Sequence, residues 1–178
     1  GYTRIPLAEQ TLADLDTPLS IYLKLANDRY TFLLESVVGG ERFGRYSFIG
    51  LRTKSRIEVR GREITHITEY GPSKHTVEDP LEYLAAYQAQ FRVATVAGLP
   101  RFAGGLTGYF GFETAQYIEP RLARHAQANP KPDPLGVPDI LLLVTEELAV
   151  VDNLAGTITL IVYADPARPD AYQKARLD

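Results

Sequence analysis

The stretch from Phe32 to Gly50 constrains the fold most, because two short alternating runs lie on either side of a glycine-rich segment. Successive side chains of a β-strand point to opposite faces, so every second residue shares a face. The two resulting sets are Phe32, Leu34, Ser36 and Val38 in the first run, and Tyr46, Phe48 and Gly50 in the second. We predict two strands joined by a turn that the glycines supply.

Ser36 stands out in this pattern because its hydroxyl falls among apolar neighbours. A buried polar group without a partner costs about 1 to 3 kcal/mol, so this hydroxyl needs a hydrogen bond. A nearby backbone carbonyl is the usual partner of a buried serine, and a bound ligand is the alternative. Glu35 cannot join Ser36 as an acid–base pair, because adjacent strand residues face opposite sides of a sheet.

The composition limits the classes of partner. The 178 residues, 45% hydrophobic and 23% charged, suffice for the core of one soluble domain. The net charge is −3 and no basic run is present, so we expect no nucleic-acid partner. No apolar stretch approaches the roughly 20 residues of a membrane helix, so we expect no membrane partner. Cysteine is absent, which excludes disulfides and thiolate metal sites and fits a cytoplasmic location.

Two segments have the pattern of a helix start. At Thr17-Pro18 a hydroxyl cap precedes a proline whose missing N–H is not needed in the first turn, and Asp79-Pro80 repeats the pattern. The first helix has an apolar stripe of Leu19, Tyr22, Leu23 and Ala26. Residues 1–16 lack sustained periodicity and are interpreted as a lead-in.

Between these helices the pattern is that of antiparallel strands. Ile57 and Val59 alternate with charged residues, and Gly61 marks a turn before a threonine-rich run that contains Ile64 and Ile67. Alternation of this kind is typical of strands with one solvated face.

A glycine-rich segment spans residues 103–119, with four glycines within eight residues at Gly104, Gly105, Gly108 and Gly111. The spacing is not that of a dinucleotide fingerprint, and no Lys-Ser or Lys-Thr pair follows, so we do not expect phosphate binding. Glycines in a strand more often let another backbone or a ligand approach closely.

The last third of the chain is predicted to be mostly strand. Four prolines between Asn129 and Asp139 predict an extended linker. The continuous apolar run Ile140 to Val144 predicts a strand buried on both faces. A hairpin around Asn153 to Gly156 follows, and we expect these strands to complete a central sheet. Asp165-Pro166 opens a further helix, which we expect the end of the chain to truncate.

No catalytic residues are predicted in this chain. We find no Ser/His/Asp order with supporting motifs, no acidic metal cluster and no nucleophile elbow. A predicted turn at Gly71-Pro72 separates His66 from His75, and no carboxylate is spaced to join them as a metal site. Both histidines are expected at the surface.

Two segments resemble the anthranilate synthase component I family, whose members are the chorismate-using subunit that begins tryptophan biosynthesis. The first is Leu33-Leu34-Glu35-Ser36, followed by a glycine-rich turn and Arg45-Tyr46-Ser47-Phe48-Ile49-Gly50. The second resembles the family's Gly-Gly-x-x-Gly-Tyr strand, which an aromatic-acidic pair and a helix follow. Here the pair is Phe112-Glu113 where the family commonly has Tyr-Asp, and Gln116 stands where a basic residue is frequent. The resemblance covers roughly Thr17 to Tyr163.

The resemblance implies an α+β fold with largely antiparallel sheets and a few packed helices. Residues 1–178 would form a single amino-terminal regulatory domain, truncated before the family's carboxy-terminal chorismate-binding catalytic domain. In the family, the serine of the first segment contacts the feedback inhibitor L-tryptophan, a role that falls on Ser36. We expect Glu35 and Tyr46 to line the pocket, with Ser47 as a further candidate, and the helix start at Thr17-Pro18 to shape it.

The complete enzymes of the family are lyases that convert chorismate and glutamine to anthranilate, pyruvate and glutamate. Ammonia comes from a glutamine amidotransferase subunit, and magnesium is required. Because the catalytic and metal-binding residues lie in the family's carboxy-terminal domain, we expect this chain by itself to be inactive and to bind no metal.

Two alternatives remain open from the sequence. The aminodeoxychorismate synthase subunit of folate synthesis shares the architecture, although its hairpin usually lacks so complete a glycine-arginine segment. A stand-alone amino-acid-binding module is the other alternative.

Overall fold

The computed structural model describes residues 1–35, 44–129 and 132–177, and it confirms the predicted α+β class with largely antiparallel sheets. Its strands form two five-stranded sheets. Two compact units comprise Gly1–Thr53, Gln90–Gly105 and Thr145–Asp178 in the first, and Lys54–Ala89 and Leu106–Val144 in the second. The assignment of the whole chain to a single regulatory domain stays a prediction.

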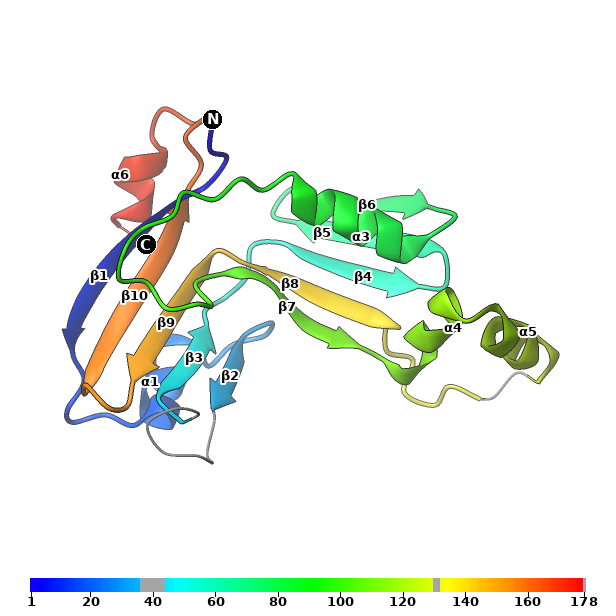
Figure 1. Ribbon diagram of the computed structural model, residues 1–178, viewed down its shortest axis with the longest axis horizontal. Helices are drawn as coiled ribbons and strands as arrows, with labels where there is room; N and C mark the ends of the chain where they lie inside the picture. The colour runs from blue at the N-terminus through cyan, green and yellow to red at the C-terminus, as the bar shows by residue number, and fades with distance from the viewer. Residues whose placement is uncertain (36–43, 130–131, 178) are drawn as a thin grey trace. The chain divides into compact units, whose positions relative to one another are not determined.

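The sheet of the first unit has the strand order β1-β10-β9-β3-β2 (Figure 1). In that order its strands are Ile5–Leu12, Thr157–Ala164, Glu147–Asp152, Tyr46–Gly50 and Phe32–Glu35. The pairing of β9 with β10 confirms the hairpin predicted around Asn153 to Gly156.

Strand β1 corrects the interpretation of residues 1–16 as a lead-in. It pairs with β10 along its whole length in antiparallel register. Most of its side chains are exposed, because it lies at an edge of the sheet. An exposed edge strand needs little hydrophobic alternation, so residues 5–12 show no periodic pattern of apolar side chains.

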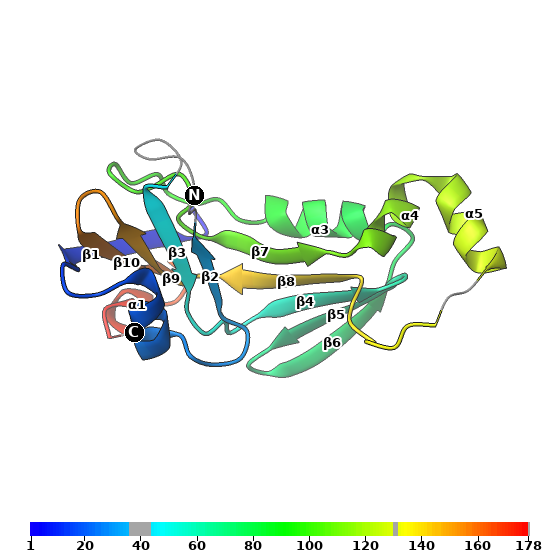
Figure 2. The ribbon, with the colours of Figure 1, turned by 90° about the horizontal axis from the view of Figure 1, so that it is seen from below.

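Helix α1, Pro18–Leu25, begins where the sequence predicts. The Thr17 hydroxyl accepts a hydrogen bond from the Ser20 N–H at 3.1 Å, and the Ser20 hydroxyl accepts one from the Thr17 N–H at 3.0 Å. This capping box satisfies two N–H groups at the helix end. The helix packs beside β2 and β3 (Figure 2). The buried residues shared by α1 and the sheet are Ile21, Ala26, Ile49, Ala149, Val151 and Ile158.

The apolar stripe predicted for α1 is wrong in part. Ala26 is buried and Tyr22 is partly buried, as expected, but Leu19 and Leu23 are exposed. Ile21 packs against the sheet instead, so the buried face of the helix is not the one that the predicted stripe describes.

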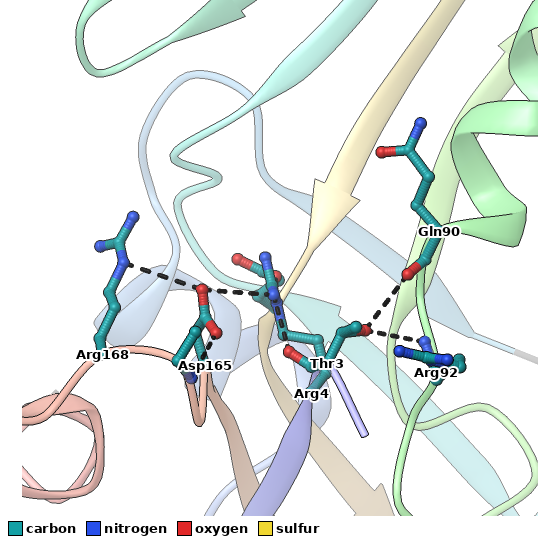
Figure 3. Close-up of polar contacts among 8 residues, drawn as sticks. Thr3, Arg4, Gln90, Arg92, Asp165 and Arg168 are labelled. Carbon is teal, nitrogen blue, oxygen red and sulfur yellow. Dashed lines mark hydrogen bonds and ion pairs between the residues drawn. The ribbon is translucent and has the colours of Figure 1, made fainter. Parts of the chain in front are cut away.

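The amino-terminal segment is tied to two other parts of the first unit (Figure 3). The Thr3 hydroxyl donates a hydrogen bond to the Gln90 carbonyl at 3.3 Å and accepts one from the Arg92 N–H at 2.8 Å. The guanidinium of Arg4 lies 3.6 Å from the Asp165 carboxylate, just after β10. Residues before β1 are therefore anchored by side-chain contacts as well as by the sheet.

Helix α6, Ala171–Ala175, packs against β10 and begins later than predicted. A turn comes first, in which the Asp165 carboxylate accepts a hydrogen bond from the Ala167 N–H at 3.0 Å. The buried alanines of the helix pack on Ala164 of the strand.

The sheet of the second unit has the strand order β6-β5-β4-β8-β7. In that order its strands are Gly71–Thr76, Glu63–Thr68, Arg56–Arg60, Ile140–Thr145 and Gly105–Phe110. Its helices are α3 (Pro80–Ala89), the 3₁₀ turn η1 (Phe112–Thr114), α4 (Ala115–Ile118) and α5 (Pro120–Ala128). The strands predicted on either side of Gly61 and the helix predicted at Asp79-Pro80 are confirmed.

Two strand predictions need correction. Gly71-Pro72 opens β6 instead of forming a turn, and proline is tolerated there because β6 is an edge strand. The predicted single central sheet is wrong, because β8 lies in one sheet and the β9–β10 hairpin lies in the other. Only Glu146 separates β8 from β9.

Glycine allows the close packing of β7 on β8. A Cβ atom added at Gly108 would lie 1.9 Å from the Leu141 carbonyl oxygen. This confirms that the glycine-rich strand lets another backbone approach. Strand β8 is almost entirely buried between β4 and β7, as its apolar sequence predicts.

His66 is not the surface residue that the sequence predicts. It is half-buried opposite Ile57 of β4, on the sheet face that α3 covers. Its Nε2 lies 2.7 Å from the Ser55 hydroxyl, and its ring meets the Tyr87 ring edge to face at 5.4 Å. Burial lowers the pKa of His66 below its ordinary value. His75 is exposed, as predicted.

Candidate functional site

The predicted tryptophan-site residues fall on two neighbouring strands of the first unit. Glu35 is the last residue of β2, and Tyr46 and Ser47 begin β3. Ser36 lies outside the described residues, so its predicted role stays a prediction.

The strand register separates these residues onto two faces. Glu35 is directly opposite Ser47, and Tyr46 is directly opposite Asp152 of β9. Directly opposed residues of antiparallel strands share a face, and successive residues alternate. The structure therefore brings Glu35 and Ser47 together on one face and places Tyr46 on the other.

The face with Glu35 and Ser47 is the one that α1 covers, since Ile49 on the same side of β3 packs in the α1 cluster. Ser47 is only 1% exposed, whereas Glu35 is exposed on the edge strand β2. The Ser47 hydroxyl accepts a hydrogen bond from Asn153 Nδ2 at 3.1 Å. Its bond to the protein leaves Ser47 better suited to supporting a site than to contacting a ligand.

The opposite face is aromatic. The Phe48 ring meets the Phe102 ring edge to face at 5.3 Å, and Tyr46 lies 6.3 Å from Phe48. The Phe32 ring covers Gly50, where an added Cβ atom would lie 2.0 Å from a ring carbon. Tyr46 itself is half-buried, so part of its ring is available at this end of the sheet.

A polar group at the start of β3 was missed by sequence reasoning. The Arg45 Nε and Nη2 atoms donate to Asp152 Oδ2 at 2.9 and 2.6 Å. The same guanidinium lies over the Tyr46 ring, 4.9 Å from its centroid. The Asn153 N–H donates to the Arg45 carbonyl at 2.8 Å. We call the set of Arg45, Asp152 and Asn153 the Arg45–Asp152 clasp.

The clasp contains an ion pair between the Arg45 guanidinium and the Asp152 carboxylate. The hydrogen bond from Arg45 is the main cause that holds the pKa of the Asp152 carboxyl below its ordinary value, against the opposing effect of burial. The same bond raises the pKa of Arg45. Arg45 was visible in the motif beside Tyr46, but no spacing rule could pair it with a residue more than a hundred positions away.

The described residues also bear on two further features, a metal site and a membrane-spanning helix. Within it, no three His, Asp or Glu side chains gather in a group that could hold a metal ion. Nor does that part contain a helix both long and apolar enough to cross a membrane.

The two-sheet fold is also found in a solved structure. It matches the crystal structure of anthranilate synthase component I from Streptococcus pneumoniae TIGR4 with a TM-score of 0.55, over 95% of this chain and 35% of that one. Sequence identity in that match is 20%, so the likeness concerns the fold. No protein-family model matches the chain.

Sequence comparison identifies the family. The chain is 54% identical over 99% of its length to anthranilate synthase component 1 of Neisseria meningitidis serogroup C, and 50% identical over 100% to that of Pseudomonas aeruginosa. The Aquifex aeolicus protein of the same name is 36% identical over 99% of the chain. The chain belongs to the anthranilate synthase component I family, which confirms the resemblance found in its motifs. It spans 35 to 36% of the length of these relatives.

Proposed function

We propose that this chain is the regulatory amino-terminal part of an anthranilate synthase component I. In the complete protein, the proposed reaction converts chorismate and glutamine to anthranilate, pyruvate and glutamate, with a glutamine amidotransferase subunit and magnesium. The family's carboxy-terminal catalytic domain would supply the catalytic residues. The observation that supports this proposal is the 54% identity to a relative of that name over 99% of the chain.

The proposed regulatory ligand is L-tryptophan, bound where β2 ends and β3 begins. Ser36 would bond its polar end, and Tyr46 would line the site from one face of the sheet. Glu35 lies on the other face, so its carboxylate would reach the ligand around the sheet edge at β2. The exposed Glu35 carboxylate is complementary to an ammonium group, and the half-buried Tyr46 ring is complementary to an indole. Feedback would follow if tryptophan binds better to the form of the enzyme that turns over poorly, which shifts the population toward that form.

Isothermal titration of L-tryptophan into the complete subunit tests this proposal, with L-phenylalanine as the control ligand. We expect saturable binding of L-tryptophan and no binding of L-phenylalanine. Ser36→Ala should weaken binding and inhibition while the catalytic rate is kept, because the serine is placed at the inhibitor and outside the catalytic domain. Unchanged inhibition of this variant would remove Ser36 from the site.

The same titration with the present chain reports how much of the site it contains. Binding to the chain means that residues around Glu35 and Tyr46 suffice, whereas binding only to the complete subunit means that other segments supply essential contacts. Identification of the product as anthranilate separates this proposal from aminodeoxychorismate synthesis.

A further inference from the structure

We propose that Asp152 and Asn153 are positioning residues of the inhibitor site, which fix Arg45, Tyr46 and Ser47 without contacting the inhibitor. This inference rests on the proposed tryptophan site. It assigns a regulatory role to a turn that is distant in sequence from the family motif.

Asn153, in the turn after β9, makes three hydrogen bonds to the start of β3 and the residues just before it. The Asn153 side chain donates to the Gly44 carbonyl at 3.4 Å and to the Ser47 hydroxyl at 3.1 Å. Together with the backbone bond from Asn153 to Arg45, these contacts fix both the path of the chain before β3 and the rotamer of Ser47. Glu35 lies directly across from Ser47, so the position of one affects the other.

Asp152 provides a rigid anchor for these contacts. Its side chain is 11% exposed, and its Oδ1 atom also accepts hydrogen bonds from the Leu154 and Ala155 N–H groups, both at 3.1 Å. Two N–H groups of a tight turn therefore fix the carboxylate, which then fixes Arg45 through charge-assisted bonds. The guanidinium in turn lies over the Tyr46 ring.

This support comes from the interior of the sheet. Strand β9 lies between β10 and β3, whereas β2, which carries Glu35, is an edge strand. A site built on an edge strand keeps its geometry only if neighbouring residues hold its side chains in place. The clasp connects the candidate site to β9, a largely buried interior strand.

Two substitutions separate the ion pair of the clasp from the hydrogen bonds of Asn153. Asp152→Asn keeps an oxygen that can accept from the Leu154 and Ala155 N–H groups, but it removes the charge that holds Arg45. Asn153→Ala leaves the ion pair intact and removes the bonds to Gly44 and Ser47. Asp170→Asn is the matched control, because it breaks an exposed ion pair with Lys174 at the start of α6.

The test measures tryptophan inhibition, kcat and KM for chorismate in the complete subunit. We expect Asp152→Asn and Asn153→Ala each to raise the half-inhibitory tryptophan concentration about tenfold, the effect of one lost hydrogen bond to an effector site. The kcat and KM values should stay near wild type. A general loss of folding would change these values together with the inhibition. Asp170→Asn should leave all three quantities unchanged.

Unchanged inhibition in both clasp variants, with a wild type that responds to tryptophan, would overturn this inference and leave the proposed function standing. A wild-type subunit that does not bind tryptophan overturns both. If Asp152→Asn fails to fold, Asn153→Ala decides the test, because that variant retains the Arg45 ion pair.

Discussion

At the scale of single residues, Asp152 matters because its buried carboxylate accepts hydrogen bonds from three groups. Arg45 and two backbone N–H groups all point to one carboxylate. A neutral side chain at this position could accept from the backbone N–H groups but could not form an ion pair with the guanidinium. The charge of Asp152 is therefore the property to test.

Asp152→Asn should lower the free energy of unfolding at pH 7, and the deficit should shrink in acid. Arg45 holds the pKa of Asp152 below its ordinary value in the native state. The ionised carboxylate thus contributes stability above the unfolded-state pKa of about 3.9, and the contribution is lost as the pH falls through the lower native-state pKa.

Urea unfolding of both proteins between neutral and acidic pH measures this difference. The two unfolding free energies should converge below about pH 4, since asparagine has no matching titration. A gap that stays constant over this range would mean that the ionised form of Asp152 is not what stabilises the native state.

Gly108 is the second residue that decides local structure, because it has no Cβ atom. Gly108→Ala should lower the free energy of unfolding by about 2 to 4 kcal/mol, because the new Cβ atom would displace the backbone of β8. The control is Gly61→Ala, which meets no atom within 4 Å but must adopt a φ of +57°. Its cost should be nearer 1 kcal/mol. Equal losses in thermal unfolding of the two variants would contradict close packing at Gly108.

At the scale of elements, local signals decided which structures could be predicted. Helix α1 was found because Thr17 and Pro18 mark a helix start within two residues. Strand β8 was found because an apolar run needs burial on both faces. Strand β1 was missed because its sequence has no periodic apolar pattern. Its place in the sheet depends on pairing with β10, about 150 residues away.

Pairings between distant strands also limited the prediction of the site. The alternation that places Tyr46 and Phe48 on one face could be read from the sequence and is confirmed. The contacts of Ser47 and Arg45 could not, because their partners lie at the end of β9 and in the turn after it. No local pattern indicates which of several predicted strands will be the neighbour of β3.

The N-cap of α1 gives a prediction at this scale. Thr17→Ala removes the hydroxyl that accepts the Ser20 N–H and should lower the free energy of unfolding by about 1 kcal/mol. Thr11→Ala, at an exposed position of β1, is the matched control and should change it by less than about 0.5 kcal/mol. Thermal unfolding of both variants measures the difference, and equal stabilities would argue against the cap.

At the scale of the whole molecule, the proposed function predicts a stability that depends on ligand. A ligand that binds only the native state stabilises it by about 2.7 kcal/mol at a hundred times its Kd. L-tryptophan should therefore raise the Tm of the complete subunit in a concentration-dependent way, and L-phenylalanine should not. The Ser36→Ala and Asn153→Ala variants should need more tryptophan for the same shift.

The absence of tryptophan residues from the chain allows a direct optical version of this experiment. Indole emission from a solution of the chain and L-tryptophan comes from the ligand alone, so its anisotropy reports the bound fraction. A rise that wild-type chain produces and that Tyr46→Ala reduces would place the indole beside the aromatic face of β3. A rise that is the same for Tyr46→Ala would move the indole to the Glu35 face, where Glu35→Gln should then weaken binding.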